Sequence, residues 1–338
     1  MGVTLPALPS VLAIDAGNSK TDVALIGPDG SVLRTGQAGG FQPSRTGVPA
    51  AVDVLAEALA AAGIGDGGTG DGGGGGRPLA AHVSACLANA DFPAEERELA
   101  REIERRNWGR VTAVHNDTFA LLRAGLPTGA EPRGVAVVCG AGINCVGMAP
   151  GGRTARFPAI GRISGDWGGG GGLAEEALWW ASRAEDGRGG ATELARALPA
   201  HFGHDSVLSL VEALHLGRIP AGRRHELVPV LFAVAAAGDP VAQALVERQA
   251  DEIVAMAAVA LGRLDLLAEE VPVLLGGSVA AARHPRLTDR VVSGLADRAP
   301  HARVAVVTAP PVLGAGLLGL DALGAPPGAH GKLRAHFG

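Results

Sequence analysis

The sequence lacks the features that direct a chain into a membrane or onto nucleic acid. No apolar run reaches the roughly 18 residues that a membrane-spanning helix needs, and residues 1–10 have neither the basic flank nor the apolar run of a signal peptide. No stretch combines basic residues with aromatic ones, and the formal net charge is −5. We therefore expect a cytoplasmic protein that binds neither membranes nor nucleic acid.

Cysteine is also scarce. The three cysteines, Cys86, Cys139 and Cys145, form no CxxC pair and lie inside apolar, strand-like runs. This pattern is typical of reduced, buried thiols.

The chain has enough apolar residues to form a large hydrophobic core. Its 338 residues are 47% hydrophobic and 19% charged, so burial can offset the entropy lost on folding. The length predicts about two domains.

A pattern near the N-terminus recurs in the middle of the chain. Residues 11–33 hold two apolar runs around a glycine-containing turn and a second turn at 28–30, which predicts three antiparallel strands. Residues 135–152 repeat the strand, the glycine turn and a shorter strand, so that Asp15-Ala-Gly17 aligns with Gly140-Ala-Gly142. A fold duplicated within one chain explains this pattern, although two unrelated glycine hairpins would also produce it.

Helical and strand patterns alternate through the rest of the chain, which predicts an α/β fold. We expect helices at 49–62, 93–106, 173–184 and 240–264, strands at 80–87, 110–114, 271–275 and 304–308, and a closing helix within 312–323. The glycine- and aspartate-rich residues 65–76 predict a flexible surface loop. The two expected lobes are residues 1–127 and 128–338.

The first glycine turn, residues 15–21, is the first candidate site. Glycine allows a ligand to approach the backbone closely, and backbone N–H groups with polar side chains can face a phosphate. The candidate nucleotide contacts here are Asp15, Gly17, Ser19, Lys20 and Thr21, with Asp15 also able to hold a hydrated Mg²⁺. A plain hairpin turn would look similar. The second turn, with Gly140 and Gly142, favours the functional interpretation because duplication would bring two such turns face to face across a cleft.

A carboxylate follows the strand that ends near Val114. Asp117, after His115 and Asn116, stands at the carboxyl end of a strand, where ligands bind in α/β sheets. It is the candidate general base for an attacking hydroxyl. The alternative is that Asp117 simply caps the helix that starts at Thr118.

Two further glycine-rich segments complete the set. Residues 161–172 are rich enough in glycine for a ligand to approach the backbone, and Asp166 there can accept hydrogen bonds from sugar hydroxyls. Gly276, Gly277 and Ser278 follow a buried strand, where a flat ring such as adenine can lie against the backbone. The alternatives are a flexible linker for the first segment and an ordinary strand-to-helix turn for the second.

The order of these motifs, from 15–21 through 116–117, 140–144 and 165–166 to 275–278, resembles the BadF/BadG/BcrA/BcrD ATPase family, which includes N-acetylglucosamine kinases. The resemblance spans about residues 12–320. It implies two ribonuclease-H-like lobes of duplicated βββαβαβα topology around an ATP cleft, and a homodimer. It further implies transfer of the γ-phosphoryl group of Mg·ATP to the 6-hydroxyl of an amino sugar.

The same resemblance implies a role for each motif. Asp117 corresponds to the catalytic base, residues 19–21 to the first phosphate loop, and 276–278 to the adenosine pocket. Asn116, Asn144 and Asp166 correspond to sugar contacts.

Three departures from the family pattern leave the acceptor open. The chain has Gly40-Phe41-Gln42-Pro43 where an asparagine is usual, Ala141 where a threonine is common, and Trp167 where many relatives have glutamate. Two other functions therefore stay open, an ATPase that energises a partner enzyme and a sensor that binds ATP and sugar without turnover. Because the first of these uses an iron–sulfur cluster held by exposed cysteines, the buried cysteines disfavour it.

Overall fold

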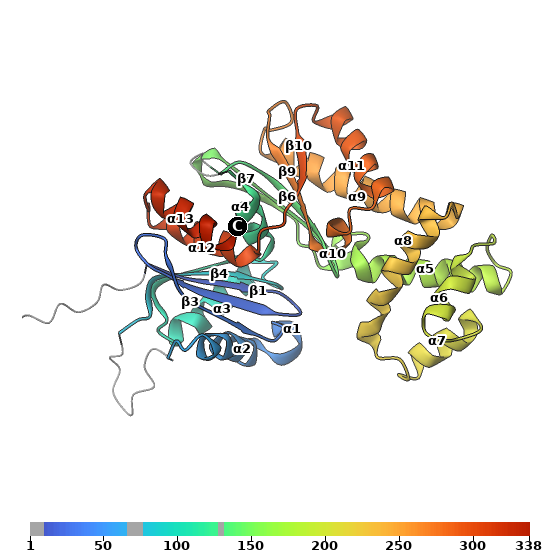
Figure 1. Ribbon diagram of the computed structural model, residues 1–338, viewed down its shortest axis with the longest axis horizontal. Helices are drawn as coiled ribbons and strands as arrows, with labels where there is room; N and C mark the ends of the chain where they lie inside the picture. Colours follow the sequence, from blue (N-terminus) through green and yellow to red (C-terminus); the bar gives the residue numbers. More distant parts are fainter. Residues whose placement is uncertain (1–9, 66–76, 128–131) are drawn as a thin grey trace, which may run out of the picture. The chain divides into compact units, whose positions relative to one another are not determined.

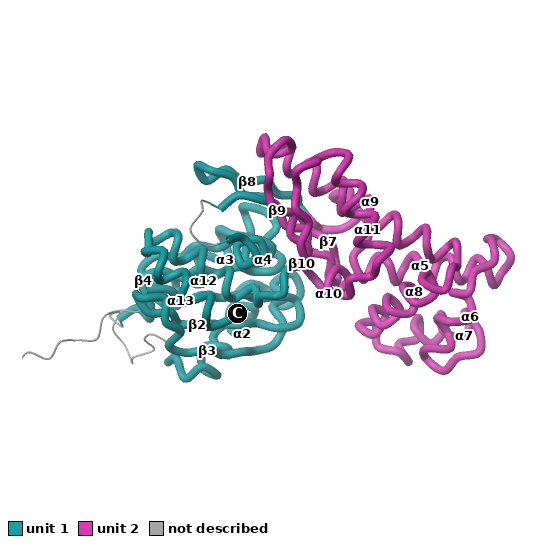
Figure 2. Tube along the Cα trace, turned by 45° about the horizontal axis from the view of Figure 1, so that its top comes forward, with its two compact units in different colours: residues 1–134, 146–158, 307–338 teal, residues 135–145, 159–306 magenta. Residues whose placement is uncertain are grey.

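The computed structural model describes residues 10–65, 77–127 and 132–338, which form two compact units (Figure 2). Unit 1 comprises residues 1–134, 146–158 and 307–338, and unit 2 comprises residues 135–145 and 159–306. The domain division at 127/128 remains a proposal. Residues 307–338 make most of their contacts with unit 1 and therefore belong to it.

Two five-stranded sheets carry the architecture (Figure 1). The first has the order β3-β2-β1-β4-β5, with β1 (Val11–Ala16), β2 (Thr21–Ile26), β3 (Val32–Ala38), β4 (Ala80–Leu87) and β5 (Gly109–Asn116). The second has the order β8-β7-β6-β9-β10, with β6 (Gly134–Cys139), β7 (Ile143–Ala149), β8 (Arg153–Arg156), β9 (Pro272–Gly276) and β10 (Arg303–Val306). The identical order confirms the duplicated α/β fold.

The helices follow the same duplication with an insertion in the second half. Unit 1 contains α1 (Pro43–Thr46), α2 (Val48–Ala61), α3 (Pro93–Arg105), α4 (Thr118–Gly125), α12 (Pro311–Ala322) and α13 (Pro327–Phe337). Unit 2 contains α5 (Gly169–Glu185), α6 (Leu194–His201), α7 (Val207–His215), α8 (Leu227–Ala236), α9 (Pro240–Arg263), α10 (Gly277–Ala281) and α11 (Pro285–Arg298). Helices α6, α7 and α8 have no counterpart among the elements that the sequence predicted.

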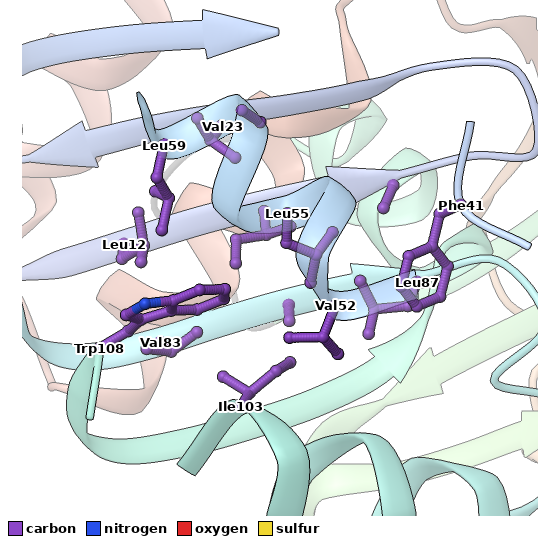
Figure 3. Close-up of a cluster of buried hydrophobic side chains, with 14 of the residues drawn as sticks. Leu12, Val23, Phe41, Val52, Leu55, Leu59, Val83, Leu87, Ile103 and Trp108 are labelled. Atoms are coloured by element: carbon purple, nitrogen blue, oxygen red, sulfur yellow. The ribbon is translucent and has the colours of Figure 1, made fainter. Parts of the chain in front are cut away.

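Strand β1 is buried along its whole length because helices cover both faces of the first sheet. Its even-numbered residues lie in a core with α2, α3 and Trp108, and Figure 3 shows Leu12, Leu55 and Trp108 in that cluster. Its odd-numbered residues, Val11 and Ala13, lie in a second core with α12 and α13. A strand buried on both faces is expected to be apolar throughout rather than alternating.

Glycines let α12 approach its neighbours closely. A Cβ on Gly314 would lie 1.8 Å from the carbonyl oxygen of Ala120 in α4, and one on Gly319 would lie 2.4 Å from Cγ1 of Val11 in β1. Side chains at these positions would force the helices apart. Helix α4 is therefore held directly on α12, and its N-terminus follows Asp117.

Most expected elements are confirmed to within a few residues, and one boundary was wrong. The helix expected at 173–184 begins at Gly169, because the glycines at 169–172 form the first turn of α5 instead of a loop. Residues 66–76 of the expected loop at 65–76 lie outside the described residues.

The prediction of buried thiols is confirmed. Cys86, Cys139 and Cys145 are buried, and burial raises the pKa of each thiol, that of Cys139 to about 12. Within the described ranges no single helix is long and apolar enough to cross a membrane, although the bent pair Ala221–Ala236 and Pro240–Arg263 passes that test of length and composition together.

Candidate active site

Unit 1 places two carboxylates at one edge of its sheet. Strands β1, β4 and β5 are parallel, and Ala16, Leu87 and Asn116 pair across them near their carboxyl ends. Asp15 precedes Ala16, and Asp117 follows Asn116. The structure thus brings together two candidate residues that are far apart in the sequence, at the edge where ligands bind in α/β sheets.

Burial raises the pKa of both carboxyl groups, and the charge of Asp117 adds to the effect on Asp15. Burial raises the pKa of Asp15 well above its ordinary value, the charges of Asp117 and Asp22 raise it further, and Lys20 opposes them. Burial also raises the pKa of Asp117 to about 6, against hydrogen bonds from Thr118. A carboxyl group whose pKa lies near neutrality is suited to proton transfer.

Asp117 occupies the N-cap position of α4, yet its side chain makes no capping hydrogen bond. The N–H of Thr118 instead donates to Oδ1 of Asn116 at 3.0 Å, and Nδ2 of Asn116 donates to Oδ1 of Asp91 at 2.8 Å. The capping alternative for Asp117 therefore has no support in the geometry. Asn116 is itself buried and holds the turn that carries Asp117.

The first glycine turn links β1 to β2. Gly17 donates its N–H to the carbonyl of Lys20 at 2.8 Å, and Lys20 pairs with Asp22 at 2.7 Å. Ser19 and Lys20 are exposed. Thr21 is fully buried, and its hydroxyl donates to the carbonyl of Gly39 at 2.9 Å. Of the side chains in the predicted phosphate loop, those of Ser19 and Lys20 are thus accessible, and that of Thr21 is engaged in the sheet.

Neighbouring segments brace this turn through Asn18. Nε2 of Gln42 donates to the carbonyl of Asn18 at 2.9 Å, and Nδ2 of Asn89 donates to its Oδ1 at 3.1 Å. A Cβ on Gly40 would lie 2.1 Å from the same carbonyl. The residues at 40–42, which depart from the family pattern, therefore support the turn.

In unit 2, the second glycine turn packs on the start of α5. The N–H groups of Gly170 and Gly171 donate to the carbonyls of Gly140 at 2.7 Å and Ala141 at 2.8 Å. These donors would otherwise be unsatisfied at a helix N-terminus. A Cβ on Gly169, whose φ is +70°, would lie 2.4 Å from the carbonyl carbon of Gly142. This contact requires glycine at position 169.

The predicted adenosine segment adjoins the same turn. Gly276 ends β9, and Gly277 opens α10 with a φ of +82°. A Cβ on Gly277 would lie 2.3 Å from the carbonyl oxygen of Cys139. Unit 2 therefore brings Gly140, Gly142 and the segment 276–278 together.

Two of the predicted sugar contacts, Asn144 and Asp166, belong to unit 2. Asp166 is buried, and its Oδ2 accepts hydrogen bonds from the hydroxyl of Ser164 and from the N–H of Gly161, the latter at 3.2 Å. Asn144 lies in β7, and its Oδ1 accepts the N–H of Cys145 at 2.7 Å. The carboxylate is thus fixed by its own short segment, three residues before α5 begins.

The carboxylate pair in unit 1 suits a hydrated magnesium ion. Mg²⁺ is usually held by one or two carboxylates and keeps several of its waters. Bound there, it would relieve the repulsion that raises the pKa of Asp15. The described part of the chain has no group of three or more His, Cys, Asp or Glu side chains that could hold a metal ion.

Two residues near the candidate site gave no signal in the sequence. Asn89 adopts a φ of +60° and bonds to the first turn, and Gln249 accepts the N–H of Gly169 at 2.8 Å. A single asparagine after a strand and a single glutamine on a long helix are too common to be singled out.

Comparison with known proteins finds solved structures with a similar fold. One solved structure is a protein of Chromobacterium violaceum assigned as an N-acetylglucosamine kinase, with 23% identity, a TM-score of 0.66, and coverage of 93% of this chain and 100% of that one. A Porphyromonas gingivalis protein with the same assignment has 20% identity, a TM-score of 0.61, and coverage of 91% and 97%.

A third solved structure is a ROK family glucokinase from Streptomyces griseus in complex with glucose and AMPPNP. It has 19% identity, a TM-score of 0.55, and coverage of 93% and 98%. A search of curated proteins found no match. Residues 12–319 match the model of one family. The chain belongs to the BadF/BadG/BcrA/BcrD ATPase family.

Proposed function

We propose that this chain is an ATP-dependent kinase that phosphorylates an amino sugar, N-acetylglucosamine or a relative, on its 6-hydroxyl. The observation that carries the proposal is the state of Asp117: a half-buried carboxylate at a sheet edge, with no capping bond and a pKa of about 6. The folds that the chain resembles belong to proteins assigned as sugar kinases, which supports a sugar as the acceptor.

In this proposal Asp117 accepts the proton of the sugar hydroxyl. The hydroxyl oxygen then bonds to the γ-phosphorus, the bond from that phosphorus to the bridging oxygen breaks, and ADP leaves with the electron pair. Asp15 would hold Mg²⁺ through water, and the ion would supply neutralisation of the charge on the phosphates. Asn116 keeps the turn that bears Asp117 in place through its bonds to Thr118 and Asp91.

The glycine segments serve the nucleotide. In the first turn the proposed phosphate contacts are Ser19 and Lys20, in the second turn they are backbone N–H groups, and the segment 276–278 is the proposed contact for adenosine. Since Ala141 has no hydroxyl, the second turn relies on its backbone alone. Asn144 and Asp166 are the proposed sugar contacts.

The test is ADP release by the purified protein with Mg·ATP and a panel of sugars. The panel is N-acetylglucosamine, glucosamine, N-acetylmuramic acid, N-acetylmannosamine and glucose. Release stimulated by one amino sugar and lost in Asp117→Asn is the expected result. Hydrolysis that ignores the sugar would instead favour an ATPase that energises a partner, and binding of ATP and sugar without release would favour a sensor.

A further inference from the structure

Gln249 is a buried amide in the middle of α9, beside the start of α5. Its side chain is fully buried, and its Oε1 accepts the N–H of Gly169 at 2.8 Å. Its Nε2 is buried as well and has no hydrogen-bond partner in the structure. Because an unpaired buried donor destabilises a fold, packing alone does not explain a glutamine here.

The amide fits tightly against the glycine run. A Cβ on Gly168, whose φ is +99°, would lie 2.1 Å from Oε1 of Gln249. Three successive N–H groups then have fixed partners: that of Gly169 bonds to Gln249, and those of Gly170 and Gly171 bond to the glycine turn at 140–142. Gln249 is therefore connected to that turn through Gly169, whose next two residues donate to the turn.

Two neighbours of Gln249 on α9 interact with Trp167, the residue before the glycine run. The guanidinium of Arg248 stacks 4.1 Å from the ring centroid of Trp167. Burial and the charge of Asp166 raise the pKa of Glu252, while Arg248 and the backbone of Trp167 lower it. Helix α9 therefore fixes the segment 166–169 from one face.

We propose that Gln249 is a positioning residue that holds the second glycine turn in the conformation that binds phosphate. It acts through the start of α5 and does not itself touch the nucleotide. This inference rests on the proposed function only for the role of the turn in binding ATP. The link from Gln249 to the turn stands on contacts within unit 2.

Hydrogen exchange measured by mass spectrometry tests the link without reference to activity. Gln249→Met keeps the length of the side chain and removes the acceptor for Gly169. Peptides covering 139–145 and 165–172 are expected to exchange faster in this variant, with little change elsewhere. Gln243→Met is the matched control, because Gln243 lies on the same helix and donates to the carbonyl of Ala235 instead. Equal exchange in the two variants would overturn the inference.

Two further measurements test the inference if Gln249→Met folds poorly. In the unaltered protein the N–H groups of residues 169–171 should exchange slowly, although those at a helix start are ordinarily free, and rapid exchange there would overturn the link. Gln249→Glu retains an acceptor oxygen and, at a pH low enough to keep the buried carboxyl group protonated, is expected to restore the protection that Gln249→Met loses. Failure of this rescue would also count against the inference.

ATP affinity measured by calorimetry connects the link to function. Loss of one hydrogen bond that positions the turn is expected to weaken ATP binding about fivefold in Gln249→Met, while sugar KM and the binding of ATP by Gln243→Met stay unchanged. An equal loss of ATP and sugar affinity would indicate general loosening and overturn the positioning role. If the unaltered protein binds no ATP, the proposed function fails, and the exchange experiment still decides the link.

Discussion

The negative charge of Asp117 raises the pKa of Asp15, so the end of β1 and the start of α4 are coupled electrostatically. Both carboxylates are also perturbed by burial, which disfavours their charged forms. A pair of this kind destabilises the protein at neutral pH unless a cation or a proton is bound.

Asp117→Asn is expected to remove activity and add stability. As general base, Asp117 contributes about 10²- to 10⁴-fold to kcat. Its pKa is raised from 3.8 to about 6, so its contribution to stability is present below the unfolded pKa and is lost as pH rises through the folded one. Asparagine avoids that loss, worth about 3 kcal/mol at pH 7 at 1.36 kcal/mol per pKa unit.

Urea denaturation at pH 7 and pH 4 checks the stability half of this prediction. The gain should be large at pH 7 and small at pH 4, where the carboxyl group is mostly protonated in the fold. A loss of stability at pH 7 would show that the carboxylate is needed by the fold and would remove the argument for a functional role.

The pH dependence of kcat/KM should carry the titration of Asp117. Because the base must be ionised, kcat/KM is expected to fall about tenfold per pH unit below a pH of about 6. Bound Mg²⁺ favours the ionised form, so the corresponding limb of kcat should lie at lower pH. Identical limbs in both profiles would contradict a cation near this pair.

Asp15→Asn tests the proposed Mg²⁺ site. Removing a carboxylate that holds the ion through water is expected to raise the Mg²⁺ concentration needed for half-maximal activity by about 10- to 100-fold. Excess Mg²⁺ should restore much of kcat, since the base is intact. An unchanged Mg²⁺ requirement would place the ion elsewhere.

The sequence predicted most of the strands and the duplicated fold, because these depend on local patterns. Apolar runs separated by glycine turns predicted β1, β2, β6 and β7, and the alignment of Asp15-Ala-Gly17 with Gly140-Ala-Gly142 predicted the duplication that the two sheets confirm. The helix expected at 240–264 is likewise confirmed as α9, and Asp239 caps it by accepting the N–H of Ala242 at 2.9 Å.

What the sequence did not predict depends on contacts between distant segments. Glycine has low helix propensity, so the run at 169–172 did not indicate a helix, yet the close approach of Gly142 requires it. Thr21 appeared as accessible as Lys20 until its partner, the carbonyl of Gly39, was known. Gln249 gave no signal, because only the fold brings it to Gly169.

The glycines at 169 and 172 should respond differently to alanine. In Gly169→Ala a Cβ at a φ of +70° would clash with Gly142, so the second turn must move and ATP affinity should fall about tenfold or more. Gly172→Ala adds a Cβ with nothing within 4 Å and should be neutral or slightly stabilising. Calorimetric titration with ATP compares the two, and equal affinities would refute the packing argument.

The C-terminal helices should stabilise unit 1 through Arg123. This buried guanidinium donates to Asp321 of α12 at 2.6 and 3.1 Å, and Asp321 also bonds to Nε2 of His330 at 2.8 Å. Arg123→Met is expected to lower the free energy of unfolding by about 2 kcal/mol, since it leaves a partly buried carboxylate without its main partner.

Arg188→Met serves as the control for that substitution in chemical denaturation. Its pair with Asp186 is exposed on both sides, and exposed ion pairs contribute little to stability. Equal effects of the two substitutions would mean that the Arg123 network does not hold the C-terminal helices.

The most direct test of the central claim is the stoichiometry of sugar phosphate formed to ADP released. Mass spectrometry and ³¹P NMR of the reaction with N-acetylglucosamine, or with the best sugar of the panel, measure both. The account predicts one phosphate ester on the 6-hydroxyl for each ADP, and neither product with Asp117→Asn. ADP released without any sugar phosphate, or a phosphate ester formed equally well by Asp117→Asn, would contradict it.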